Sequence, residues 1–242
     1  MAGAHRPPVL TADATTTAAT AGVPGSGGLR PLQRLPLLAL GFAALVVGTG
    51  AGLSRLGVAV PDAAASAASL HGPLMIGGFF GVVIALERAV AVGRGWPYLA
   101  PLLAGLGGIV AMAGAARAAA ALMLVASLVL VAASVDILRR QRALFTFTIA
   151  AGAACWAVGN LLWLLGTPVH GVVAWWLAFP ILTIAGERLE LTRFLPPSRP
   201  ATGLFVACSP AVCPAVSSGV GQGDVRAALR PHRRRRADHV PL

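Results

Sequence analysis

The sequence contains no lysine, a single tyrosine, three cysteines and only eight acidic residues, set against 19 arginines. Charged residues make up 11% of the 242 residues, whereas 57% are hydrophobic and the mean hydropathy is +0.78. That balance excludes a water-soluble globule. A net charge of +11 alone would suit a nucleic-acid-binding protein. We expect no nucleic-acid partner, because the arginines flank apolar runs and aromatic residues are scarce.

Six uncharged apolar stretches approach the roughly 20 residues that a helix needs to cross the bilayer core. They are Leu35–Ser54, Ala63–Leu86, Trp96–Ala116, Ala118–Val135, Ala143–Gly166 and Val169–Gly186. The fourth is short, and only Arg117 separates it from the third. Gly48 with Gly52, and Gly77 with Gly81, have the spacing of small residues at close helix crossings. The sequence predicts an all-α transmembrane bundle over residues 35–194, with glycine faces as candidate contacts in a homo- or hetero-oligomer.

The arginines are distributed unevenly between the two sides of such a bundle. Eleven lie on the side of the N-terminus, and only Arg55 and Arg117 lie on the other. The remaining six lie in the C-terminal tail, which a count of six spans places on the side of the N-terminus. The eleven are Arg6, Arg30, Arg34, Arg88, Arg94, Arg139, Arg140, Arg142, Arg188, Arg193 and Arg199. Because arginine beside a span resists translocation, we predict cytoplasmic termini and a multi-pass protein of the inner (cytoplasmic) membrane, with the lipid bilayer as its first partner.

The two ends of the chain differ from the apolar region. Residues 1–34 mix Ala, Thr, Gly and Pro, and we interpret them as a disordered cytoplasmic leader without a cleavable signal. Residues 195–242 are rich in Pro, Gly and Arg. Two interpretations of this tail stand: a truncated or frame-shifted end from about Cys208, or a native tail whose run Arg233–Arg236 contacts anionic lipid. No disulfide is expected.

Two apolar segments share an unusual pattern, because each begins with His-Gly and ends with Glu-Arg. They are His71–Arg88 and His170–Arg188. The histidine precedes the glutamate by 16 residues in the first segment and by 17 in the second. At about 1.5 Å per residue each helix separates these ends by roughly 25 Å. We therefore expect both histidines at the outer face and both Glu-Arg pairs at the inner face.

The paired histidines are candidate metal ligands, since neutral imidazole binds iron, copper and zinc. Held at equal depth on parallel helices, His71 and His170 would grip haem b between them or share a copper ion. Met75, one turn after His71, would add a soft ligand. The alternative is that each histidine only caps its helix or hydrogen-bonds in the interface. Asn160, flanked by two tryptophans, is either a hydrogen-bonded residue of an aromatic belt or part of a cofactor or quinone pocket.

The Glu-Arg pairs favour a structural interpretation over proton transfer or substrate binding. Neighbouring residues of one helix do not face each other. We therefore expect exchange between the two helices, with Glu87 reaching Arg188 and Arg88 reaching Glu187. Such pairs would clamp the inner ends of the two helices.

The segments LHGPLMIGGFFGVVIALERAVAVG (70–93) and WWLAFPILTIAGERLELTRF (175–194) resemble an uncharacterised group of bacterial polytopic membrane proteins. That group is similar to NnrS, a haem- and copper-containing protein linked to nitric-oxide stress, and more distantly to the main subunit of haem-copper oxidases. The resemblance implies that His71 and His170 are ligands. The chain has no His-His pair and half of the usual twelve spans, which argues against oxygen or nitric-oxide reduction.

We therefore expect an integral membrane protein of unknown role that binds haem b or copper through outer-face histidines, and we expect no catalysis. Two other classes remain open. One is a small transporter, in which the glycine-rich second and third spans flex and the Glu-Arg pairs gate the cytoplasmic end. The other is a membrane assembly or scaffold subunit that contacts lipid and partner helices.

Overall fold

The computed structural model describes residues 27–192, and every regular element in that range is helical. The elements are α1 (Pro31–Arg55), α2 (Asp62–Ser66), η1 (Ala68–Leu70), η2 (Pro73–Phe80), α3 (Gly81–Val92), η3 (Trp96–Tyr98), α4 (Leu99–Met112), α5 (Ala116–Arg140), α6 (Leu144–Leu164) and α7 (Val169–Thr192). The predicted all-α class is confirmed. Most of the predicted leader and the whole basic tail, with both interpretations of it, lie outside the described residues.

Five helices are long and apolar enough to cross a membrane, which indicates a membrane-embedded protein. They are Pro31–Arg55, Pro73–Val92, Ala116–Arg140, Leu144–Leu164 and Val169–Leu191. A further apolar helix, Trp96–Met112, is shorter. At about 1.5 Å per residue its length is roughly 25 Å, less than the 30 Å or so of a typical hydrocarbon core. The count of six spans therefore stays a prediction.

The short helix is the third of the predicted stretches, and the fourth is long. We expected the fourth to cover Ala118–Val135, whereas α5 runs for 25 residues from Ala116 to Arg140. Arginine does not end this helix, because its long side chain extends to the interface while the stem stays alongside the helix. The third stretch ends early, since Gly114 turns the chain with a φ of +85°.

The second predicted span also begins later than the expected residue 63. The chain first forms the short helices α2 and η1, and the membrane-length helix starts at Pro73. Its first eight residues, η2, form a wide π-helical segment that continues directly into α3. Proline at the start of η2 has no N–H to donate, so it suits a helix beginning at this point. His71 consequently lies in the transition from η1 into η2.

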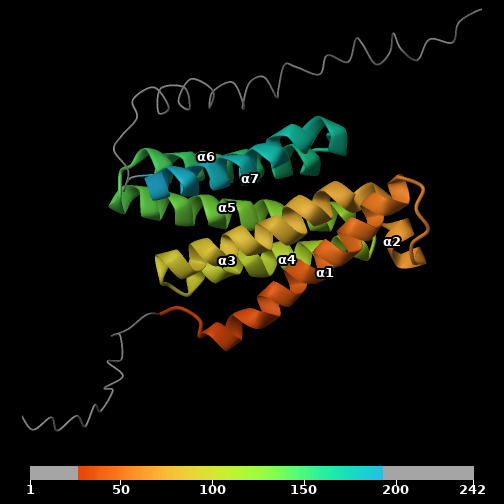
Figure 1. Ribbon diagram of the computed structural model, residues 1–242, viewed down its shortest axis with the longest axis horizontal. Coiled ribbons are helices and arrows are strands. Elements are labelled where there is room, and N and C mark those ends of the chain that lie inside the picture. The colour runs from red at the N-terminus through yellow and green to blue at the C-terminus, as the bar shows by residue number, and fades with distance from the viewer. Residues whose placement is uncertain (1–26, 193–242) are drawn as a thin grey trace, which may run out of the picture.

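The bundle has two layers, with α5, α6 and α7 in one and α1, α3 and α4 in the other (Figure 1). Figure 1 also shows α1, η2–α3, α4, α5, α6 and α7 each running from one end of the bundle toward the other. Helices that follow one another along the chain pack together from α4 to α7, and α1 packs against η2. The layers meet where the ring of Trp156 on α6 packs against Gly81 of α3, at which a methyl carbon would lie 2.6 Å from Trp156 Cζ2. Within its own layer the same ring stacks on Phe179 of α7, with 4.8 Å between centroids. Successive long helices that each run from one end of the bundle toward the other are the arrangement that a multi-pass membrane chain requires.

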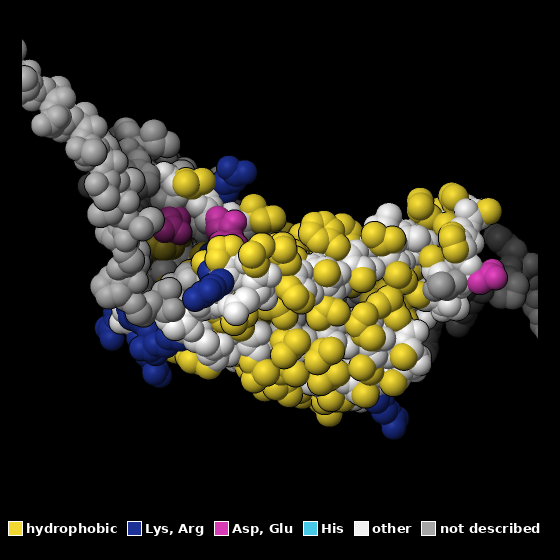
Figure 2. All heavy atoms as spheres, turned by 90° about the horizontal axis from the view of Figure 1, so that it is seen from below, with side chains coloured by type: hydrophobic (Ala, Val, Ile, Leu, Met, Phe, Trp, Pro, Cys, Tyr) yellow, Lys and Arg dark blue, Asp and Glu magenta, His cyan; other side chains and the backbone are white. Residues whose placement is uncertain are grey.

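The outer surface carries an apolar belt between polar ends. Figure 2 shows hydrophobic side chains over the middle of one face, with most arginines gathered at one end. Large apolar side chains such as Phe42, Val46 and Phe147 are more than half exposed. Surfaces of this kind are costly in water and suit contact with lipid chains.

Candidate site around His71

The ring of His71 lies against the backbone of α1. Its Nδ1 is 2.7 Å from the carbonyl oxygen of Gly48. A carbonyl oxygen only accepts hydrogen bonds, so we assign the proton to Nδ1, which donates it to Gly48. The other ring nitrogen, Nε2, then carries a lone pair and has no hydrogen-bond partner within residues 27–192.

Two glycines of α1 make room for this arrangement. A methyl carbon at Gly52 would lie 2.8 Å from Nδ1 of His71, and one at Gly48 would lie 3.1 Å from the Met75 sulfur. Both distances are shorter than an ordinary van der Waals contact, so larger residues would displace these side chains. The predicted close crossing at Gly48 and Gly52 is confirmed, and it is formed with η2 and with His71, which lies two residues before η2.

His71 and Met75 line the same cavity, as their spacing of one helical turn suggested. Its volume is about 480 Å³, and Thr49, Leu53 and Arg55 of α1 form much of the opposite wall. The lining of the cavity is chemically mixed, because the imidazole of His71, the thioether of Met75 and the guanidinium of Arg55 border a largely apolar space. An imidazole nitrogen and a thioether are ligands for soft metal ions, so the residues fit the kind of group that the sequence implied.

His170 lies at the same end of the bundle but not in this cavity. It occupies the first turn of α7 and is exposed. Its neighbour Val169 approaches Gly72, where a methyl carbon would lie 3.4 Å from Val169 Cγ1. His71 thus faces α1 while the next residue faces α7, and no described contact joins the two imidazoles. In the described part of the chain, no group of three or more His, Cys, Asp or Glu side chains is arranged to hold a metal ion.

Asn160 lies in the interior of the bundle, between α5, α6 and α7. It is fully buried, donates from Nδ2 to the carbonyl of Met123 over 2.9 Å, and accepts a 3.0 Å hydrogen bond from Nε1 of Trp176. These contacts tie α6 to α5 and to α7. The expected hydrogen bonding is therefore confirmed, whereas a place in an interfacial belt stays a prediction. The cavity around His71 is lined by other residues.

At the opposite end, Arg88 is the centre of the predicted clamp. Its side chain is 9% exposed, and Nη2 lies 3.7 Å from Oε1 of Glu187, which confirms the expected pair between α3 and α7. The same nitrogen is 3.1 Å from Oε1 of Glu87. The expected pairing of Glu87 with Arg188 is therefore wrong, because the long side chains of Glu87 and Arg88 bend together although they are adjacent. Arg188 is exposed.

The partner of His71 could not be named from the sequence, because it is a backbone carbonyl. The only available signal was the Gly48 and Gly52 spacing, which indicated a close approach of another helix without saying which side chain would fill it. The asymmetry of the two Glu-Arg pairs was also hidden, since burial of Arg88 and exposure of Arg188 depend on packing.

The chain was compared with known families, proteins and structures. A family model described as "Domain of unknown function (DUF8744)" matches residues 34–229. No curated protein and no solved structure matches the chain. The match extends over more than half of the sequence and includes the whole region from η2 to α7.

Proposed function

The chain belongs to the DUF8744 family, whose function is unknown, and we propose that it binds copper or haem b at the outer face of the inner membrane through His71. In this arrangement six spans cross the bilayer, and α4 with η3 forms the short one. The arginine-rich end, with Arg88 and the turn between α5 and α6, faces the cytoplasm. The role is binding, and no reaction is assigned to it.

One observation carries this proposal, the hydrogen bond between His71 and Gly48. Metal-binding histidines usually donate their second ring N–H to a carbonyl or carboxylate, which fixes the tautomer and the ring orientation. The 2.7 Å hydrogen bond from Nδ1 to the Gly48 carbonyl fixes the tautomer and the orientation of the His71 ring in this way. It leaves the lone pair of Nε2 available to bind a metal ion. A histidine that only capped its helix would not need a ring held between two glycines of a neighbouring helix.

The surrounding donors favour copper. The Met75 thioether is a soft ligand of the kind that selects Cu(I), and it lines the same cavity as His71. His170 remains a second imidazole donor because its helix begins beside Gly72, the residue after His71. Both His-Gly segments resemble a group of membrane proteins that is in turn similar to NnrS, and this resemblance supports haem b as the other candidate, with imidazole as an iron ligand.

Spectra and metal analysis of the detergent-purified full chain, expressed with haem and copper available, test the proposal. We expect either a Soret band or copper at about one equivalent. His71→Ala should abolish it, and Met75→Leu should weaken copper binding while leaving haem unchanged. The matched control is His232→Ala, which removes a histidine from the C-terminal region and should retain the bound group.

Two results would overturn the proposal. One is a parent protein that is colourless and free of metal after that expression. The other is a His71→Ala variant that retains as much haem or copper as the parent. His170→Ala separates the one-histidine and two-histidine sites, since only the second loses its group in that variant.

A small transporter is the second candidate, and the π-helical segment η2 favours it. Such segments are rare in helices and frequent at functional sites. In η2, Gly77 and Gly78 have no side chain that restricts their backbone torsions, so this segment is suited to a change of helical pitch. Proton- or ion-coupled uptake into proteoliposomes by a metal-free protein would favour this function over metal binding.

A further inference from the structure

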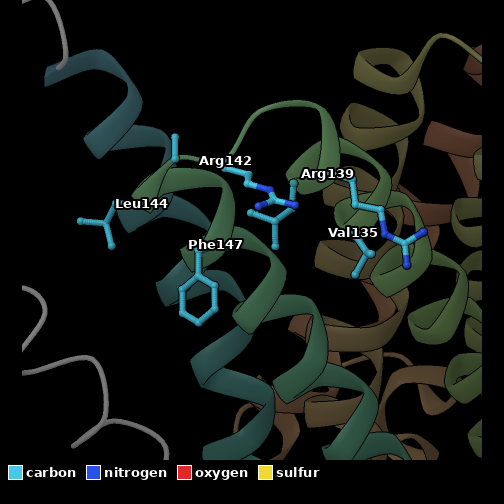
Figure 3. Close-up of a pocket in the computed structure, with 7 residues that line it drawn as sticks. Val135, Arg139, Arg142, Leu144 and Phe147 are labelled. Carbon is cyan, nitrogen blue, oxygen red and sulfur yellow. The ribbon is translucent and has the colours of Figure 1, made fainter.

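A groove opens at the arginine-rich end between α5 and α6, far from His71 along the bundle. Its volume is about 640 Å³, and its lining combines Arg139 and Arg142 with five apolar residues, among them Val135, Leu144 and Phe147. Figure 3 shows Arg142 extending from the turn between the two helices toward α5, where Arg139 and Val135 lie. Neither of the two cations that flank the groove contacts an acidic residue among residues 27–192.

The arginines of this turn differ in their ion pairs. Arg140 pairs with Asp136 one turn earlier on α5, and Asp136 also lies 3.6 Å from Arg94. Within the described residues neither Arg139 nor Arg142 forms an ion pair. The single acidic side chain in the turn is thus already neutralised by other arginines. In the described part of the chain, two positive charges on the rim of the groove therefore have no counterion.

The other wall of the groove is apolar and exposed. Phe147 is 61% exposed and Leu144 is 39% exposed, both on α6. Phe147 lies three residues after Leu144, the first residue of α6, which is roughly 4.5 Å farther along the helix toward the apolar belt. Figure 3 shows the Phe147 ring on the side of α6 away from the core and farther from the turn than Arg142. The site is therefore cationic at the membrane surface and apolar just below it.

We propose that this groove binds an anionic glycerophospholipid of the cytoplasmic leaflet, with its phosphate between Arg139 and Arg142 and an acyl chain against Phe147. Guanidinium groups match phosphate oxygens in charge and geometry. Basic pockets at the cytoplasmic ends of membrane helices are suited to such headgroups. The apolar wall distinguishes this occupant from a free phosphate ion, which would gain nothing from Leu144 and Phe147.

Photolabelling of the full chain in phosphatidylcholine nanodiscs tests this assignment. The probe is phosphatidylglycerol with a diazirine in its acyl chain, compared with the same diazirine on phosphatidylcholine. We expect the anionic probe to label residues 143–147 at least five-fold more strongly than the neutral one. The double variant Arg139→Gln with Arg142→Gln should reduce labelling by the anionic probe to the level seen with the phosphatidylcholine probe. Each of the two single variants should reduce it in part.

Arg140→Gln is the matched control, since it removes the same charge from the same turn at an arginine that pairs with Asp136 instead of lining the groove. It should leave labelling within two-fold of the parent. The arginine tail is present in every variant, so binding of lipid there cannot produce the difference. Equal labelling by the two probes, or an unchanged double variant, would overturn the proposal. Displacement of the anionic probe by millimolar inorganic phosphate would overturn the lipid as occupant and point to a free anion.

Discussion

Trp176 donates a hydrogen bond from its indole nitrogen to the side-chain oxygen of Asn160 in the dry interior of the bundle. Both side chains are almost completely buried, and Asn160 passes the connection on to the backbone of Met123. Three helices are joined by two hydrogen bonds. A polar residue in this position is costly unless it is paired, so its partners determine how α5, α6 and α7 can pack.

Asn160→Leu keeps the branched shape and the number of heavy atoms of the side chain but removes both hydrogen bonds. We expect the free energy of unfolding to fall by about 1–2 kcal/mol, because Nε1 of Trp176 loses its acceptor. Reversible unfolding in SDS mixtures measures this change. Thr148→Val is the control, because the hydroxyl of Thr148 bonds only to the carbonyl of Leu144 in its own helix. A loss for Asn160→Leu no larger than for Thr148→Val would contradict the assigned role.

Two glycines that face Ala44 should respond oppositely to the same substitution. A methyl carbon at Gly78 would lie 2.6 Å from Cβ of Ala44, whereas one at Gly108 would lie 3.6 Å from it. Gly78→Ala must push η2 away from α1 and should destabilise by about 1–3 kcal/mol. Gly108→Ala meets an ordinary contact and should be neutral or stabilising by up to about 1 kcal/mol.

The double variant Gly78→Ala with Ala44→Gly tests the cause, because it exchanges the two side chains across the contact. Stability in SDS titration should return most of the way to the parent. If the exchange restores nothing, the loss in Gly78→Ala comes from the π-helical backbone of η2 and not from Ala44.

The two Glu-Arg dipeptides look equivalent in the sequence but should differ in energetic weight. Arg88→Gln leaves Glu87 and Glu187 without the cation that lies between them, and we expect a loss of about 2 kcal/mol. Arg188→Gln removes an exposed charge and should change stability by less than about 0.5 kcal/mol. Thermal unfolding in detergent compares the two variants, and equal losses would refute the buried clamp.

The sequence predicted the features that depend on period and charge. Apolar runs located the helices to within a few residues at α1, α6 and α7, and the arginine distribution agrees with the end at which Figure 2 shows the basic side chains. The sequence also predicted the ion pair between Arg88 and Glu187. These inferences depend on one helix or one end of the bundle, for which composition and spacing suffice.

The remaining features depend on contacts between helices. That His71 faces α1 and Gly72 faces α7 follows from the rotation of η2 about its axis, which a π-helical segment alters. The pattern His-Gly suggested two equivalent ligands at equal depth, and it carried no information about that rotation. Burial of Asn160 was equally hidden, because two flanking tryptophans occur both in interfaces and in cores.

The tautomer of His71 can be tested without any bound metal, and Gly52 is the residue that controls it. In the parent protein, ¹⁵N spectra of histidine-labelled samples at alkaline pH should show His71 protonated on Nδ1, because the Gly48 carbonyl accepts that hydrogen bond. Gly52→Ala places a carbon 2.8 Å from Nδ1 and must displace the ring. We expect the spectrum to move toward the mixture of tautomers of a solvated imidazole. Gly108→Ala should leave the resonance unchanged, and an Nε2-protonated parent would remove the basis for assigning Nε2 as a ligand.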